Sequence, residues 1–189
     1  MGARSLVEQA MTAVPRAGFL PAAQRSRAGE DRPLPIGEQQ TSSQPRTVAA
    51  MLDLLDVGTG HRVLDVGAGS GWTTALLAHL VGPTGSVLGV ELSPTLARWG
   101  AANLAASGHP WARLREASPG VLGAPDEAPF DRVLVSAEAD VLPAALVDQL
   151  GSEGVLVIPV AGVMHRVVRS PGGVIDTTTH GGYQFVPLR

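Results

Sequence analysis

The sequence of 189 residues has no cysteine, no long apolar run and no run of like charge. Without cysteine, disulfides, thiolate metal sites, iron–sulfur clusters and thiol nucleophiles are excluded. No stretch reaches the roughly 18 apolar residues that cross a bilayer, and the first residues lack the apolar core of a signal peptide. We therefore expect a cytoplasmic protein with no membrane partner.

The charge balance argues against a nucleic acid partner. The net charge is -3, and the 14 arginines are dispersed along the chain, whereas phosphate binding needs a concentrated basic face. Hydrophobic residues make up 44% of the sequence, which is typical of a globular protein. The histidines show no metal-ligand spacing, and we expect no metal site from His61, His79, His109, His165 and His180.

The second part of the chain alternates between strand and helix patterns. Apolar runs predict parallel strands at 62–66, 86–91, 111–115, 130–136 and 154–159, with helices at 71–81, 93–106 and 143–150 between them. Further strands are expected at 163–169, 174–178 and 184–188. This order predicts an α/β fold: a Rossmann-like, doubly wound, mostly parallel sheet with an antiparallel edge and helices on both faces.

The first part of the chain has a different pattern. Helical spacing is found at 4–14 and 46–56, with Gly58 expected at the end of the second helix. Residues 15–45 are rich in proline and predict a long irregular segment, which in a compact domain is usually either functional or disordered. We predict one domain over 1–189, in which 1–57 forms a helical part that covers the substrate and cofactor, and 58–189 forms the Rossmann-like core.

Three glycines follow the first strand of that core. Gly67, Gly69 and Gly71 alternate with other residues, and Trp72 stands where a dinucleotide fingerprint has its third glycine. Asp65 places a carboxylate beside the loop, which suits a cationic ligand better than a pyrophosphate. Glu91 ends the second strand, where an acidic side chain binds ribose hydroxyls. The alternative is a tight turn flanked by two surface carboxylates.

The glycine loop resembles the first motif, D-x-G-x-G-x-G, of class I methyltransferases. A second resemblance lies upstream, to the D-x-P-L-P-I-G-x-x-Q-T-x-S-x-P segment of the protein-L-isoaspartate (D-aspartate) O-methyltransferase family. The matching residues are Asp31, Pro33, Leu34, Pro35, Ile36, Gly37, Gln40, Thr41, Ser43 and Pro45. The segments at 14–21, 128–137, 151–160 and 185–188 are also similar to that family, so the resemblance spans almost the whole chain.

The resemblance implies methyl transfer from S-adenosylmethionine to the α-carboxylate of an isoaspartyl residue in a peptide or protein, leaving S-adenosylhomocysteine. It implies Ser43 as the catalytic hydroxyl. It implies a cofactor site made by Gln40, Thr41, Ser42, Ser43, Asp65, Gly67, Ala68, Gly69, Gly71, Glu91, Leu92 and Gly120. It also implies that backbone groups of Leu34, Pro35, Ile36 and Val186 bind the substrate.

Three positions depart from the family pattern. Ser42 is polar where the family is usually apolar, and Pro119 replaces an acid near the adenine, so adenine must be bound by backbone carbonyls or by Glu116. Glu138 lies in a loop that is usually alanine-rich, which indicates either an altered substrate pocket or a solvated loop. Two alternatives stay open: a tailoring enzyme that converts a peptide aspartate to an aspartimide, and a non-catalytic S-adenosylmethionine-binding protein.

Overall fold

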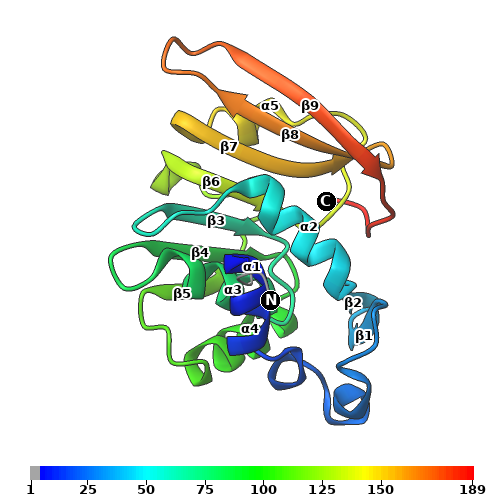
Figure 1. Cartoon of the computed structure of the whole chain (residues 1–189). Helices are drawn as coiled ribbons and strands as arrows, with labels where there is room; N and C mark the ends of the chain where they lie inside the picture. Colours follow the sequence, from blue (N-terminus) through cyan, green and yellow to red (C-terminus); the bar gives the residue numbers. More distant parts are fainter. Residues whose placement is uncertain (1–4) are drawn as a thin grey trace.

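A seven-stranded sheet forms the centre of the molecule, in the order β5–β4–β3–β6–β7–β8–β9 (Figure 1). The computed structural model describes residues 5–189, so the expected start of the first helix at Arg4 lies outside the described part. The strands are β3 (Arg62–Val66), β4 (Ser86–Glu91), β5 (Ala112–Glu116), β6 (Phe130–Val135), β7 (Leu150–Val160), β8 (Val163–Arg169) and β9 (Ile175–Gly182). Strands β3 to β7 are parallel, and β8 and β9 add an antiparallel edge.

The central strands form because their sequences are apolar on both sides. Val63, Leu64 and Val66 of β3 are all buried, as expected for a parallel strand that is covered on both faces. The helices that connect the strands begin at clear signals. Helix α3 (Trp72–Val81) follows Gly71, and α4 (Pro94–Ala106) has Ser93 as its N-cap. The predicted Rossmann-like, mostly parallel sheet is confirmed.

The two faces of the sheet are covered unequally. One face packs against α1 (Leu6–Ala13), α2 (Pro45–Leu55), α3 and α4. The other face packs against the short helix α5 (Ala144–Val147) and the chain that leads from β5 to β6, which contains the 3₁₀ helix η3 (Pro125–Glu127). Helices therefore lie on both faces, but the second face is closed mainly by irregular chain.

Several predicted element boundaries were wrong. The helix expected at 143–150 is only the four-residue α5, because Leu150 already pairs with Phe130 and begins β7. Residues 184–188 form no strand and make a single bridge between Glu138 and Pro187. Helix α2 ends at Leu55, and its C-cap is Asp56, with a φ of 54°, and not Gly58.

The segment at 15–45 is ordered and not irregular as predicted. It contains the 3₁₀ helices η1 (Arg16–Phe19) and η2 (Ala22–Arg27), followed by a hairpin of β1 (Leu34–Gly37) and β2 (Gln40–Ser42). The hairpin turns through Glu38 and Gln39, with φ values of 51° and 59°. The division of the chain at residue 57 stays a prediction, and α1 and α2 share one hydrophobic core with α3 and the sheet.

Candidate active site

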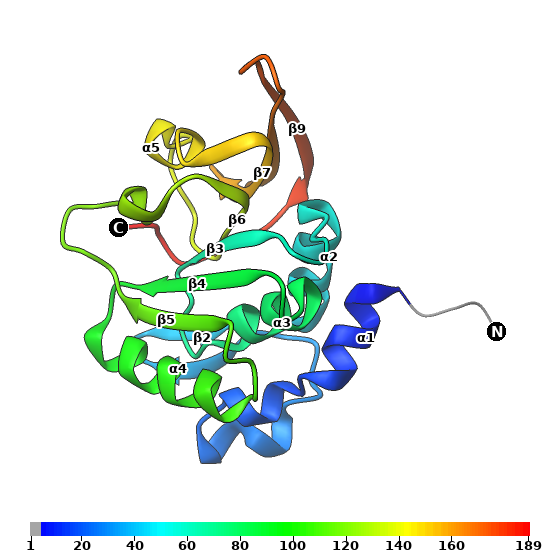
Figure 2. The same cartoon turned by 90° about the vertical axis from the view of Figure 1, so that its left-hand side faces the viewer.

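A cavity of about 720 Å³ opens at the carboxyl ends of β3, β4, β5 and β6. Strand β6 lies beside β3 although β4 and β5 come between them in sequence, so the winding of the sheet reverses here. Open α/β sheets bind ligands at this reversal, beyond the carboxyl ends of the strands. The arrowheads of β4 and β5 point to the same side as the C-terminus in Figure 2.

Two of the walls that line the cavity come from different parts of the chain. We call residues 66–72 and 90–93 the glycine-loop wall, and residues 36–43 and 186–189 the covering wall. The glycine-loop wall follows directly from β3 and β4. The covering wall consists of the hairpin β1–β2 and the end of the chain, which are far apart in sequence.

Most residues predicted for the site line the cavity. They are Ile36, Gln40, Thr41, Ser42, Ser43, Gly67, Ala68, Gly69, Glu91, Leu92, Gly120 and Val186. Leu34, Pro35, Asp65 and Gly71 are not part of the lining. Leu34 is fully buried in a small core with Leu20 and Leu96. The roles assigned to all these residues stay predictions.

The glycine loop is fixed by backbone hydrogen bonds. The N–H groups of Gly67 and Ala68 both donate to the carbonyl of Val90, at 2.9 and 3.1 Å. The three loop glycines have φ values of 76°, 53° and 84°, which favour glycine. At Gly71 a Cβ atom would also lie 2.9 Å from the carbonyl oxygen of Gly100 on α4. The loop therefore needs glycine for its conformation and for its close packing.

Glu91 connects the loop to the end of β4. Its side chain is 7% exposed; Oε2 accepts a hydrogen bond of 2.8 Å from the Gly69 N–H, and Oε1 accepts one of 2.9 Å from the Ser93 N–H. A carboxylate has about four lone-pair sites, so two stay available to hydroxyl groups in the cavity. Glu91 thus shapes the loop and still faces the cavity.

Asp65 does not reach the cavity wall. It is fully buried below the loop, where Oδ2 accepts a hydrogen bond of 2.7 Å from the Thr74 hydroxyl and Oδ1 has no partner. Burial raises the pKa of Asp65 to about 7; the Glu91 charge adds to this increase, and the Thr74 hydrogen bond opposes it. Asp65 is therefore buried away from the cavity lining in this structure, and its role beside a cationic ligand stays a prediction.

The loop after β5 forms the end of the cavity where adenine was expected. Ser118 and the chain from Gly120 to Gly123 line it, whereas Pro119 and Glu116 do not. No acidic side chain lines this part of the described chain. The available polar atoms are therefore backbone groups and the Ser118 hydroxyl, and the alternative role for Glu116 finds no support.

Gln149 holds that loop, and no pattern in the sequence points to this role. Its side chain is 3% exposed; Oε1 accepts a hydrogen bond of 2.8 Å from the Ala124 N–H, and Nε2 donates to the carbonyls of Leu122 and Ala145, both at 2.8 Å. A Cβ atom on Gly123 would lie 2.5 Å from Gln149 Oε1. This amide fixes the loop from the side opposite the cavity.

Glu138 holds the end of the chain against the sheet. Its backbone N–H donates to the Val186 carbonyl and its carbonyl accepts from the Leu188 N–H, both at 2.7 Å. Its carboxylate accepts a longer hydrogen bond of 3.4 Å from the Phe185 N–H. Both sequence interpretations of Glu138 were incomplete, because it is neither in the cavity lining nor free in a solvated loop.

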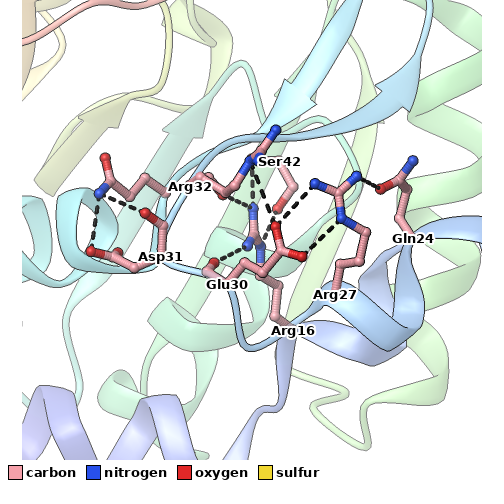
Figure 3. A network of polar contacts seen from close by, with 8 residues as sticks. Arg16, Gln24, Arg27, Glu30, Asp31, Arg32 and Ser42 are labelled. Carbon is pink, nitrogen blue, oxygen red and sulfur yellow. Dashed lines mark hydrogen bonds and ion pairs between the residues drawn. The ribbon is translucent and has the colours of Figure 1, made fainter.

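A network of polar contacts fixes the hairpin part of the covering wall (Figure 3). Arg16, which is 4% exposed, donates from Nε to the Ser42 hydroxyl at 3.0 Å and from Nη2 to the Ser42 carbonyl at 2.8 Å. The guanidinium carbon lies 5.4 Å from the ring centre of Trp72. The polar Ser42 is thus explained by Arg16, a partner that sequence reasoning missed because it lies 26 residues away.

Comparisons with known proteins agree with this arrangement. The family described as "Protein-L-isoaspartate(D-aspartate) O-methyltransferase (PCMT)" matches residues 2–189. A protein-L-isoaspartate O-methyltransferase of Methanopyrus kandleri is 46% identical over 96% of this chain and 82% of the relative. A relative of the same name from Methanocella arvoryzae is 43% identical over 94% of this chain and 95% of its own.

Solved structures share the fold. A protein-L-isoaspartate O-methyltransferase superposes with a TM-score of 0.85 at 24% identity, covering 98% of this chain and 62% of the other. A putative enzyme of this name from Plasmodium falciparum, in complex with S-adenosyl-L-homocysteine, gives a TM-score of 0.82 at 24% identity and covers 100% and 92% of the two chains. By sequence and by fold, this chain belongs to the protein-L-isoaspartate(D-aspartate) O-methyltransferase family.

Proposed function

We propose that this chain is an S-adenosylmethionine-dependent carboxyl O-methyltransferase that methylates isoaspartyl residues in peptides and proteins, as a repair enzyme. The observation that carries the proposal is the position of Ser43. Its side chain lines the same cavity as the glycine loop and Glu91, in a chain that is 46% identical to a relative named for this activity.

The residues of the cavity fit S-adenosylmethionine. A volume of about 720 Å³ lies within the range of about 300–1,000 Å³ that ligand pockets occupy. The methionine part would lie against the glycine loop, with Gln40 and Thr41 above it. Glu91 has lone pairs left for two ribose hydroxyls. The adenine would lie against the backbone of the loop held by Gln149, where carbonyl groups replace the missing acid.

The proposed reaction needs orientation more than acid–base chemistry. Bound S-adenosylmethionine supplies a methyl group on a positively charged sulfur. An α-carboxylate has a pKa of roughly 3.5, so it is ionised at neutral pH and acts as the nucleophile without a base. The Ser43 hydroxyl would donate a hydrogen bond to one carboxylate oxygen and direct the other towards the methyl group. Such alignment is a major source of rate enhancement.

The methyl ester then reacts without help from the protein. The following backbone nitrogen attacks the ester carbonyl, methanol leaves, and a succinimide forms. Water opens the ring to give aspartyl and isoaspartyl products. The enzyme's part therefore ends with the ester, and no second catalytic group is required.

The substrate peptide would bind along the hairpin. Strand β1 pairs with β2 on one side only, and no described residue pairs with its other edge. An extended peptide can use a free strand edge for backbone hydrogen bonds and so tolerate varied side chains. Backbone groups of Leu34–Ile36 and Val186 are the proposed contacts, which fits an enzyme that repairs many sequences.

A paired-peptide assay tests this function. Labelled S-adenosylmethionine is supplied with two peptides that differ only in an isoaspartyl or an aspartyl linkage. We expect label on the isoaspartyl peptide alone. Label on the aspartyl peptide would support the tailoring alternative, and label on neither, with S-adenosylhomocysteine still bound in calorimetry, would support a non-catalytic protein. Ser43→Ala should lower kcat at least about 100-fold, as for a misaligned reactant, and keep cofactor binding.

We also propose, from the sequence, that the protein acts in the cytoplasm and binds no nucleic acid. The net charge of -3 supports the second point. Within residues 5–189, no helix is both long enough and apolar enough to span a membrane. Cell fractionation and a gel-shift assay with DNA and RNA are the tests.

A further inference from the structure

Arg16 is a buried cation whose donors converge on the chain beside Ser43. Besides its two bonds to Ser42, Nη1 donates to the Glu30 carbonyl at 3.2 Å and Nη2 to the Arg32 carbonyl at 3.1 Å. Burial lowers the pKa of Arg16, while the charges of Asp31 and Glu30 raise it. Figure 3 shows the guanidinium among these carbonyls. One side chain therefore ties η1, the 30–32 segment and the end of β2 together.

Asp31 fixes the chain on the other side of Ser43. Its Oδ1 accepts a hydrogen bond of 3.0 Å from the Arg46 N–H, and its Oδ2 accepts one of 3.0 Å from Gln44 Nε2. Gln44 Nε2 also donates to the Asp31 carbonyl at 2.9 Å. The first turn of α2 is thus capped by a residue from the segment that Arg16 holds.

Ser43 lies between these two fixed points. Ser42 is held by Arg16 and Gln44 is held by Asp31, yet the Ser43 hydroxyl makes no hydrogen bond within residues 5–189. Its backbone is constrained on both sides while its donor stays free to face the cavity. A hydroxyl that orients a reactant needs such an arrangement, because its position is fixed and its hydrogen-bond donor is not used by the fold.

We propose that Arg16 is a positioning residue that sets the placement of Ser43 through Ser42, an inference that rests on the proposed function. The contact with Trp72, the first residue of α3, places the same guanidinium on the glycine-loop wall. Arg16 thereby fixes the distance between the proposed catalytic hydroxyl and the cofactor site. A shift of about 1 Å in such a distance can cost about 100-fold in rate.

The variant Arg16→Lys keeps the charge and removes the planar fork that reaches several carbonyls at once. We expect kcat on the isoaspartyl peptide to fall about 10- to 100-fold, in line with a misplaced reacting group. The dissociation constant for S-adenosylhomocysteine should stay within about threefold, which at under 1 kcal/mol leaves the cofactor site intact. Arg25→Lys is the matched control, because Arg25 lies in η2 and donates only to the Leu20 carbonyl.

A double-mutant cycle separates positioning from a general structural role. If Arg16 acts through Ser43, Arg16→Lys should have no further effect on kcat in a Ser43→Ala background. The inference would be overturned if the losses in kcat of the two single variants multiplied in the double variant, or if Arg16→Lys lost S-adenosylhomocysteine binding. Turnover by the wild type would still support the proposed function in either case. An inactive wild type would overturn both.

Ser42→Ala provides a second route if Arg16→Lys does not fold. It removes the acceptor of Nε and leaves the Ser42 carbonyl bond in place. We expect a smaller fall in kcat, about three- to tenfold, the effect of one ordinary hydrogen bond. This fall should also vanish in the Ser43→Ala background. A fall that persists there would contradict the inference.

Discussion

The glycine-loop wall and the covering wall meet at one cavity but are held by different contacts. The glycine-loop wall is fixed by backbone hydrogen bonds to Val90, by the Glu91 carboxylate and by the close packing of Gly71 on α4. In the covering wall, the side chain of Arg16 fixes the hairpin over a long sequence distance. The end of the chain is fixed by backbone hydrogen bonds to Glu138 and by a longer bond to its carboxylate.

The two walls should therefore respond differently to substitution. The glycine-loop wall has almost no free space, so added atoms or an added charge should lower the stability of the fold. In the covering wall the fold should survive the loss of one polar contact, while alignment in the cavity should suffer. The following predictions either sharpen that contrast or break it.

The largest effect is expected beneath the glycine-loop wall, at Asp65. Its pKa is about 7 in the folded protein and near 4 in the unfolded chain, so unfolding releases a proton between these values. The free energy of unfolding should therefore fall as pH rises from about 4 to 7, by up to about 4 kcal/mol from this group. Urea unfolding across this range, with Asp65→Asn beside the wild type, measures the difference.

The control is Asp31, which lies in the 30–32 segment that Arg16 holds. The hydrogen bond from the Arg46 N–H, and to a smaller extent the one from Gln44, lowers the pKa of Asp31. In the folded protein Asp31 therefore titrates below the pH range of 4 to 7 in which Asp65 titrates. Asp31→Asn should leave the slope between pH 4 and 7 as in the wild type, whereas Asp65→Asn should flatten it. A wild type and an Asp65→Asn variant with the same slope would show that Asp65 is ionised in the fold.

The second prediction concerns packing at Gly100. A Cβ atom there would lie 2.5 Å from the Gly69 carbonyl oxygen, a backbone atom that cannot move without the loop. Gly100→Ala should destabilise the protein by about 1–3 kcal/mol, as overpacking does. It should also weaken S-adenosylhomocysteine binding at least about tenfold, or about 1.4 kcal/mol. Thermal unfolding and calorimetry measure the two effects.

Gly18→Ala is the matched control for Gly100→Ala, at a glycine that is not closely packed. Gly18 lies in η1, the 3₁₀ helix that also carries Arg16, and apart from its chain neighbours no atom would come within 4 Å of an added Cβ. We expect a change within about 0.5 kcal/mol, as for an unhindered surface substitution. Equal losses in the two variants would remove the contrast between a tightly packed wall and a loosely packed one.

The smallest effect is expected at Glu138. Glu138→Ala removes the carboxylate that accepts from the Phe185 N–H and leaves both backbone bonds of Glu138 in place. We expect a loss of about 0.5–1.5 kcal/mol in stability, the range of one hydrogen bond. The KM for the peptide should rise a few-fold with cofactor binding unchanged. Asp176→Ala on the exposed strand β9 controls for charge, and an equal rise in KM there would contradict a role for Glu138.

The glycine-loop wall could be predicted because its signals are local. Strand β3, the loop and α3 follow one another within 62–81, and each has a pattern of its own. The burial of the Asp65 side chain could not be predicted in the same way. Its position beside the loop is visible in sequence, but burial beneath the loop follows from how α3 packs and brings Thr74 to it.

The covering wall could be predicted only through the family resemblance. Strands β1 and β2 are too short and proline-rich to show a strand pattern, and Glu38 and Gln39 are not residues that signal a turn. Arg16 and Gln149 were missed because their partners lie 25 to 27 residues away or are backbone carbonyls, which carry no sequence signal.

The order of strands and helices from β3 to β9, the glycine loop and the acid at the end of β4 could be read from the sequence, because each depends on neighbouring residues. Only the tertiary structure decided that Asp65 is buried, that Arg16 holds Ser42, that Gln149 supports the adenine end and that Glu138 holds the end of the chain. The physical reason is that hydrogen bonds and burial depend on which distant segments meet, and periodicity along the chain does not contain that information.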